Sequence, residues 1–219
     1  MKALAPQPNL VEQVHDAILA EIGSGRLAPG ERVIQESIAQ ALGVSRQPVQ
    51  QALLLLRRQG LLKDAPGRGL VVAPLDPAEV QHMNEMRAVI EGLACRLAAT
   101  HGVERAARQG PALVEAGRKA VASASVPRMV AADMRFHEFL YGLGGNPLVG
   151  PALATHWSTL QRVMGEVLMR DETPIDIWDQ HQAMLDAIVA GDADRAEALA
   201  RTHITHASDM MVARLKAGG

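Results

Sequence analysis

The sequence has little cysteine, few aromatic residues and no long apolar run. Cys95 is the only cysteine among 219 residues, so an internal disulfide is excluded and a cytoplasmic location is expected. Aromatic residues make up only 2% of the chain, which favours helices over sheets. No run of about 18 apolar residues is present, and the first ten residues lack the apolar core of a secretory signal. We therefore expect no membrane span and no secretory segment.

The apolar content is sufficient for one large or two small hydrophobic cores. Hydrophobic residues account for 48% and charged residues for 21% of the chain, a composition typical of globular proteins.

The formal net charge of −2 is unevenly distributed along the chain. Residues 32–73 carry six basic and two acidic side chains, whereas residues 74–219 carry fourteen basic and eighteen acidic ones. A basic segment on an acidic body indicates a polyanionic partner at one end, although ordinary surface variation gives the same asymmetry.

The first seventy residues have the pattern of three helices followed by a hairpin. Residues 1–8 contain two prolines and little pattern, and we predict that they form a flexible arm. Apolar residues then recur at helical spacing, and a second, short helix is expected at 36–42. Ser45 is placed to cap a third helix, with Pro48 in its first turn and Gly60 at its end. Two short helices joined by a tight glycine turn are typical of helix-turn-helix domains.

A β-hairpin is predicted directly after these helices. Two short apolar runs, 61–64 and 70–72, flank a Pro/Gly turn with Arg68 at its tip. Three helices and a hairpin make a winged helix-turn-helix, expected to span 9–73. A small helical domain without nucleic acid would show the same elements, so the pattern alone leaves function open. If DNA is the partner, the contacting residues are Arg32, Ser45, Arg46, Gln47, Gln50, Gly67, Arg68 and Gly69.

The run 29–72 strongly resembles the DNA-binding domain of the GntR family of bacterial regulators. The matching segments include Leu-Gly-Val-Ser-Arg at 42–46 and Gly-Arg-Gly at 67–69. The resemblance implies a DNA-binding transcription regulator, and a repressor is the expected kind. The family usually has Arg-Glu where this chain has Gln50 and Gln51, and that arginine usually contacts DNA. Because glutamine pairs with adenine and arginine with guanine, we expect a different base to be read there or one contact to be lost.

The remainder of the chain is predicted to be helical after a linker at 74–77. No alternation typical of strands appears, and glycines or Pro174 separate the helical segments. The expected fold is mainly α, with the winged helix-turn-helix followed by an all-α bundle of six helices at 78–215. The six predicted helices are 77–99, 103–122, 127–143, 147–169, 174–190 and 192–215.

Four polar side chains of this bundle have a spacing that suits a metal site. Asp133 and His137 stand four residues apart, so both project from one helix face. His181 and His203 come from the fifth and sixth predicted helices. A carboxylate and three imidazoles are suitable ligands for a divalent transition metal. Histidines that cap helices or lie on the surface would give the same spacing, so both interpretations stay open at this point.

Residues 76–215 resemble the FCD ligand-binding domain of the FadR branch of GntR regulators. The resemblance lies in the segments EMRAVIEGLACRLAA, DMRFHEFLYGLGGNPLV and DQHQAMLDAIVAGDADRAEALARTHI. It implies that the same four side chains bind a metal, with zinc as first choice and nickel or manganese as alternatives. It also suggests that Arg87 faces the cavity and pairs with the carboxylate of a small polar effector, where the alternative is a solvated arginine. The short, six-helix length is more similar to the VanR subgroup than to the seven-helix FadR type.

We expect a homodimeric regulator that binds double-stranded operator DNA and has no catalytic residues. We also expect a carboxylate effector to release this regulator from DNA. The alternatives are a regulator that senses the metal ion itself and a metalloenzyme. Against the enzyme, the sequence has no His-Glu-x-x-His helix motif and no serine or cysteine nucleophile signature. A metal sensor would change its affinity for DNA with metal alone.

Overall fold

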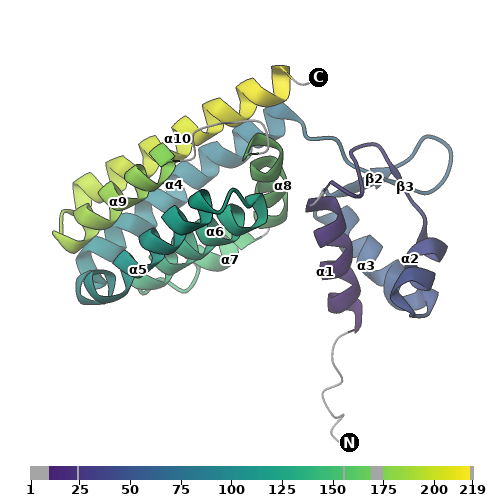
Figure 1. Cartoon of the computed structure of the whole chain (residues 1–219), viewed down its shortest axis with the longest axis horizontal. Coiled ribbons are helices and arrows are strands. Elements are labelled where there is room, and N and C mark those ends of the chain that lie inside the picture. The colour runs from purple at the N-terminus through teal and green to yellow at the C-terminus, as the bar shows by residue number, and fades with distance from the viewer. Residues whose placement is uncertain (1–9, 24, 155, 169–174, 218–219) are drawn as a thin grey trace, which may run out of the picture. The chain divides into compact units, whose positions relative to one another are not determined.

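The computed structural model describes residues 10–23, 25–154, 156–168 and 175–217 (Figure 1). The chain divides into two compact units, Met1–Pro74 and Leu75–Gly219. The predicted arm at 1–8 lies outside the described residues. None of the helices within the described ranges is long and apolar enough to cross a membrane.

The first unit is built on three helices that enclose a small apolar core. Helix α2 (Gln35–Leu42) is followed by Gly43, whose φ of 65° lies in the left-handed region that favours glycine. This residue makes the tight turn into the next helix. Ser45 occupies the N-cap position of that helix with an extended backbone, but its side chain makes no capping hydrogen bond. The structure therefore confirms the predicted N-cap position of Ser45, without a hydrogen bond from its side chain to the helix. The helices are α1 (Leu10–Gly23), α2 (Gln35–Leu42) and α3 (Arg46–Arg58).

A three-stranded antiparallel sheet in the order β1-β3-β2 completes this unit. Its strands are β1 (Arg32–Val33), β2 (Leu62–Asp64) and β3 (Leu70–Val72). The hairpin of β2 and β3, called the wing below, confirms the prediction from the sequence. The sequence does not predict β1, because two residues are too few to show alternation and the strand exists only through its pairing with β3. Three helices and the wing confirm the predicted winged helix-turn-helix.

The second unit is all-helical and contains seven helices within the described residues. α4 begins where the Asp76 carboxylate accepts a hydrogen bond from the Ala78 N–H at 2.9 Å, with Pro77 as the first helical residue. The two 25-residue helices, α4 and α10, lie side by side along the unit (Figure 1). The helices are α4 (Pro77–His101), α5 (Val103–Ala122), α6 (Val126–Leu143), α7 (Val149–Ala154), α8 (Trp157–Leu168), α9 (Ile175–Val189) and α10 (Ala193–Ala217).

The prediction of six helices in this unit is wrong because one predicted helix is two. The segment 147–169 is interrupted between Ala154 and Trp157, which separates α7 from α8. The interruption places the Trp157 ring against the Tyr141 ring, with centroids 6.0 Å apart. Apolar spacing continues across such a break and does not reveal it. The helix count therefore does not support the assignment to the shorter subgroup.

Two glycines on α5 allow α9 to approach closely. A Cβ atom at Gly117 would lie 2.0 Å from the Trp178 ring, and one at Gly110 would lie 2.4 Å from Leu185. Both distances are far below van der Waals contact, so only glycine fits at these positions without repacking. The Trp178 ring in turn packs edge-on against the His181 imidazole, with centroids 4.6 Å apart. This close helix packing therefore helps to position one of the predicted metal ligands.

Candidate functional site

Helix α3 presents a polar face to solvent at its N-terminal end. Its apolar side chains between Val49 and Leu56 fill the core of the first unit, whereas Arg46, Gln47 and Gln50 are exposed. This separation follows from helical periodicity, since residues three and four apart share a face. The exposed side chains carry the amide and guanidinium groups that pair with base edges in the major groove of DNA. The structure thus leaves the predicted base-reading residues accessible.

Arg46 is held at the start of α3 by residues of α2. Its Nη2 atom donates to the Glu36 carboxylate, and its backbone carbonyl accepts a hydrogen bond from Gln35 Nε2 at 2.7 Å. Both members of the ion pair are exposed, and such surface pairs contribute about 0–1 kcal/mol. A DNA phosphate or base can therefore replace Glu36 as the partner of Arg46 at little cost.

Arg32 holds the tip of the wing. Its guanidinium donates to the backbone carbonyls of Pro66 and Arg68, both at 3.1 Å. Gly67 and Gly69 have φ values of 91° and 98°, which glycine adopts readily, and Arg68 is exposed between them. Arg32 is among the DNA contacts expected from the sequence, and the structure places it in contact with the backbone of the wing.

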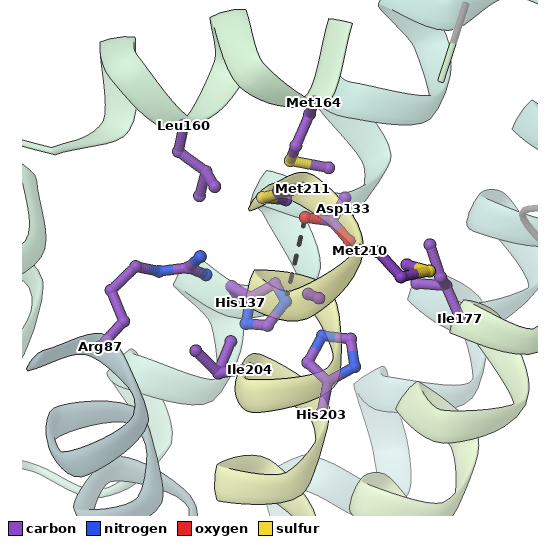
Figure 2. A pocket seen from close by; sticks show the side chains of 11 residues that line it. Arg87, Asp133, His137, Leu160, Met164, Ile177, His203, Ile204, Met210 and Met211 are labelled. Carbon is purple, nitrogen blue, oxygen red and sulfur yellow. Dashed lines mark ion pairs between the residues drawn. The ribbon is translucent and has the colours of Figure 1, made fainter. Parts of the chain in front are cut away.

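The four predicted metal ligands come together inside the second unit, and we call them the Asp-His cluster. Asp133 and His137 project from α6, His181 from α9 and His203 from α10, and all four are buried. His181 Nε2 lies 3.3 Å from His203 Nε2 and 3.5 Å from Asp133 Oδ1. His137 Nε2 lies 3.9 Å from Asp133 Oδ2 (Figure 2). Each of the three histidines offers one ring nitrogen to a common site, and these three nitrogens all lie within 4.8 Å of one another.

The three histidines of the Asp-His cluster, with the Asp133 carboxylate beside them, have the donor types that a transition-metal ion prefers. Two nitrogens bound at about 2.0–2.1 Å to one tetrahedral ion stand about 3.3 Å apart. The Nε2 atoms of His181 and His203 already have this separation. Three imidazoles and one carboxylate match the preference of zinc for nitrogen and oxygen ligands. The residues present therefore fit the implied metal.

Hydrogen bonds from outside the cluster fix two of the imidazole rings. Glu91 Oε2 accepts a hydrogen bond from His137 Nδ1 at 2.7 Å, and Gln180 Oε1 accepts one from His203 Nδ1 at 2.8 Å. A neutral imidazole that donates through Nδ1 keeps its lone pair on Nε2, so both Nε2 atoms can bind a metal. Glu91 and Gln180 are not predicted from the sequence, because no local pattern connects them to histidines 46 and 23 residues away in the chain.

Burial and neighbouring charges set the protonation of the three imidazoles. Burial, with His137 as the next cause, lowers the pKa of His203 to about 3. Burial also lowers the pKa of His181 well below its usual value. For His137 burial acts in the same direction, but Glu91 and Asp133 outweigh it and raise the pKa. His181 and His203 are therefore neutral near pH 7, the form in which an imidazole binds a metal ion.

Arg87 lies on α4 and points its guanidinium toward the Asp-His cluster (Figure 2). Its Nε and Nη2 atoms contact Glu91 Oε1 at 2.9 and 2.7 Å, and Nη1 donates to Asn84 Oδ1 at 2.9 Å. Burial by itself would raise the pKa of Glu91, but Arg87 and then His137 outweigh it and lower the pKa to about 2. Glu91 is thus a buried carboxylate that contacts both Arg87 and a predicted metal ligand.

A cavity of about 40 Å³ lies between Arg87 and the cluster. His181 is absent from its walls, and its ring stacks on Phe136 with centroids 4.4 Å apart. The polar walls are Arg87, Asp133, His137 and His203, and the apolar walls are Leu160, Met164, Ile177, Ile204, Ala207, Met210 and Met211 (Figure 2).

Comparison with known proteins gives matches over both units. Residues 10–72 match the family model of the bacterial regulatory proteins of the gntR family, and residues 82–206 match the FCD domain. An uncharacterized HTH-type transcriptional regulator from an unstable DNA locus of Streptomyces ambofaciens is 31% identical over 179 residues, which cover 81% of this chain and 75% of that protein. A probable D-xylose utilization operon transcriptional repressor of Paenarthrobacter nicotinovorans is 29% identical over 198 residues, with 89% and 85% covered. The solved structure of Escherichia coli McbR/YncC has a similar fold, with a TM-score of 0.80 at 19% identity over 94% of this chain and 98% of that one.

Proposed function

The chain belongs to the GntR family of bacterial regulatory proteins and carries an FCD domain, and from this premise we propose that it is a repressor controlled by a small carboxylate bound at a metal site. The family match identifies a DNA-binding transcription regulator, not the metalloenzyme considered from the sequence. Support for repression comes from relatives that are named as repressors. The observation that carries the effector part of the proposal is the convergence on one cavity of Arg87 and three members of the Asp-His cluster, Asp133, His137 and His203.

The Asp-His cluster would hold the metal. Two of its imidazoles, those of His137 and His203, would be oriented by their hydrogen bonds to Glu91 and Gln180. Zinc is the first choice, and nickel or manganese are the alternatives. The bound ion would supply a positive centre that takes a carboxylate oxygen, provided that its coordination expands beyond the four protein ligands.

Arg87 has donors left for a carboxylate. A guanidinium carries five N–H groups, and the contacts to Glu91 and Asn84 use one on each of its three nitrogens. In the contacts of the described residues, one N–H on Nη1 and one on Nη2 remain unused. These two groups form a fork that matches the two oxygens of a carboxylate.

The test of the proposed function is the response of operator binding to carboxylates. We expect the zinc-loaded protein to release operator DNA when a carboxylate is added. Arg87→Lys should bind operator equally well but lose the response, because an ammonium cannot reproduce the planar fork. The measurement is fluorescence anisotropy with an operator fragment obtained by binding-site selection, using metal-free protein, zinc-loaded protein, and zinc-loaded protein with acetate, butyrate, succinate or citrate.

The control for this test is Arg201→Lys, since Arg201 also pairs with a glutamate four residues away but on the half-exposed surface of α10. It should respond to carboxylates like the wild type. If zinc alone changes operator affinity and no carboxylate adds to the change, the chain is a metal sensor and the carboxylate proposal is wrong.

The recognition helix provides a second prediction. Gln50→Arg should change the preferred base from adenine to guanine at one position of each half-site, with discrimination of about 1–3 kcal/mol, because each side chain pairs bidentately with its own base. Binding-site selection followed by sequencing measures this preference. Gln51→Arg is the control, since it adds the same charge one residue along α3 and hence on another face. The same consensus for wild type and Gln50→Arg would remove Gln50 from the base-reading residues.

A homodimer is part of the proposal, because two winged units can then contact the two halves of a symmetric operator. Three large apolar side chains of α4 form an exposed stripe at helical spacing: Met86 is 52% exposed, Val89 54% and Leu93 42%. Exposed Glu85 and Arg96 lie on either side of the stripe. In an antiparallel pair of α4 helices, each Glu85 would approach Arg96 of the second copy, which already pairs with Asp194 and Glu197 of its own chain. We therefore propose this stripe as the dimer contact.

Leu93→Glu should convert the dimer into a monomer, since two like charges would be buried at the contact. Light scattering after gel filtration should give a mass near 23.4 kDa for this variant and twice that mass for the wild type. Leu148→Glu is the control, because Leu148 is 72% exposed and lies outside the stripe. A Leu93→Glu protein that remains dimeric would place the dimer contact elsewhere.

A further inference from the structure

The cavity beside the Asp-His cluster is apolar except where it meets the ligands and Arg87. Three of its wall residues, Met164 of α8 and Met210 and Met211 of α10, are methionines. Methionine is unbranched and polarizable, and its side chain adapts to ligands of different shape. A ligand that reaches Arg87 must therefore present apolar atoms to these walls, because a polar group there would lose its hydrogen bonds to water.

The net charge of the metal-loaded site favours a ligand with one negative charge. Among the described residues that line the cavity or contact its ligands, Arg87 and a bound divalent ion contribute three positive charges, and the carboxylates of Glu91 and Asp133 contribute two negative ones. The metal-bound imidazoles are neutral. The loaded site thus carries one uncompensated positive charge in a buried position, which is unfavourable. One carboxylate neutralises it, whereas a second carboxylate would be buried without a partner against leucine and methionine.

We propose that the effector is a monocarboxylate with a short aliphatic tail, which binds through its carboxylate at Arg87 and the metal and packs its tail against the three methionines. This inference rests on the proposed function, because the metal and Arg87 anchor the carboxylate. It replaces the small polar effector expected from the sequence. The cavity of about 40 Å³ has space for only a few water molecules, so a tail enters by displacing methionine side chains, and we expect short tails to bind best.

The experiment is calorimetric titration of the zinc-loaded full-length protein with acetate, butyrate, hexanoate, octanoate and succinate. From acetate to butyrate the affinity should rise about fourfold for each added methylene, the effect of burying that group. It should reach a maximum and fall for the longest tail. Succinate, which has four carbons like butyrate, should bind at least tenfold more weakly. Met210→Gln keeps the size of the side chain and should weaken butyrate binding about fivefold or more while leaving acetate binding unchanged.

Different outcomes separate the two levels of the proposal. Equal affinities for all tails, or succinate binding more tightly than butyrate, would overturn the aliphatic monocarboxylate and leave the carboxylate-controlled repressor intact. Binding of butyrate to Arg87→Lys as tightly as to wild type, or the absence of binding by any of the five acids to protein that holds zinc, would overturn both. Thermal melting of Met210→Gln shows whether the variant is folded, and Met164→Gln provides a second test of the same wall.

Discussion

Replacement of Glu91 by alanine should lower the free energy of unfolding of the helical unit by about 3–5 kcal/mol, the cost of leaving one member of a buried ion pair without its partner. The side chains of Arg87 and Glu91 are only 5% and 3% exposed, and their closest contact is 2.7 Å. The substitution also removes the acceptor of His137 Nδ1. The loss of this orienting hydrogen bond should reduce metal affinity about 10–100-fold. Urea denaturation of the metal-free protein and competition titration with a zinc chelator measure the two effects.

Glu115→Ala is the matched control for this prediction. Glu115 and Lys119 are also four residues apart on one helix, at 3.4 Å, but both side chains are more than half exposed. Its removal should change stability by no more than about 0.5 kcal/mol. The double variant Arg87→Leu/Glu91→Leu should be more stable than Glu91→Ala, because no charge is left unpaired. A loss below about 1 kcal/mol for Glu91→Ala would show that the buried pair is not ionic.

Removal of the metal should have the other large effect. At a free zinc concentration a thousandfold above Kd, binding to the folded state alone adds about 4 kcal/mol to stability. For a unit of this size, that gain corresponds to an increase of about 10 °C in Tm. Dialysis against a chelator should abolish the increase, and addition of zinc should restore it. His203→Ala should abolish it as well, because one of four ligands is lost.

His206→Ala is the control, since His206 lies on the same helix but is exposed and outside the Asp-His cluster. Its metal content and its Tm in zinc should match those of the wild type. The measurements are elemental analysis of the purified proteins and thermal melting followed by circular dichroism. Equal melting curves for wild type with and without zinc, nickel or manganese would show that the cluster is not a metal site.

Several features of this protein are determined by local sequence alone. Apolar residues at helical spacing predict α1 to α6, because the buried face of a helix repeats every three to four residues. The Asp76-Pro77 start of α4 follows from the hydrogen-bonding chemistry of a helix N-terminus, which involves only neighbouring residues. The placement of Asp133 and His137 on one face is equally local. These local signals are sufficient to predict the fold class and the shared helix face of Asp133 and His137, two of the four members of the Asp-His cluster.

Other features are decided only by tertiary structure. Strand β1 forms because β3 is beside it, and the break between α7 and α8 accompanies the packing of Trp157 on Tyr141. Glu91 and His137 are 46 residues apart in the chain, and their contact depends on how α4 packs against α6. The apolar walls of the cavity come from three helices, and their meeting determines which ligand fits. Propensity and capping act over a few residues, whereas these contacts arise from burial of helix faces against one another, which no single segment specifies.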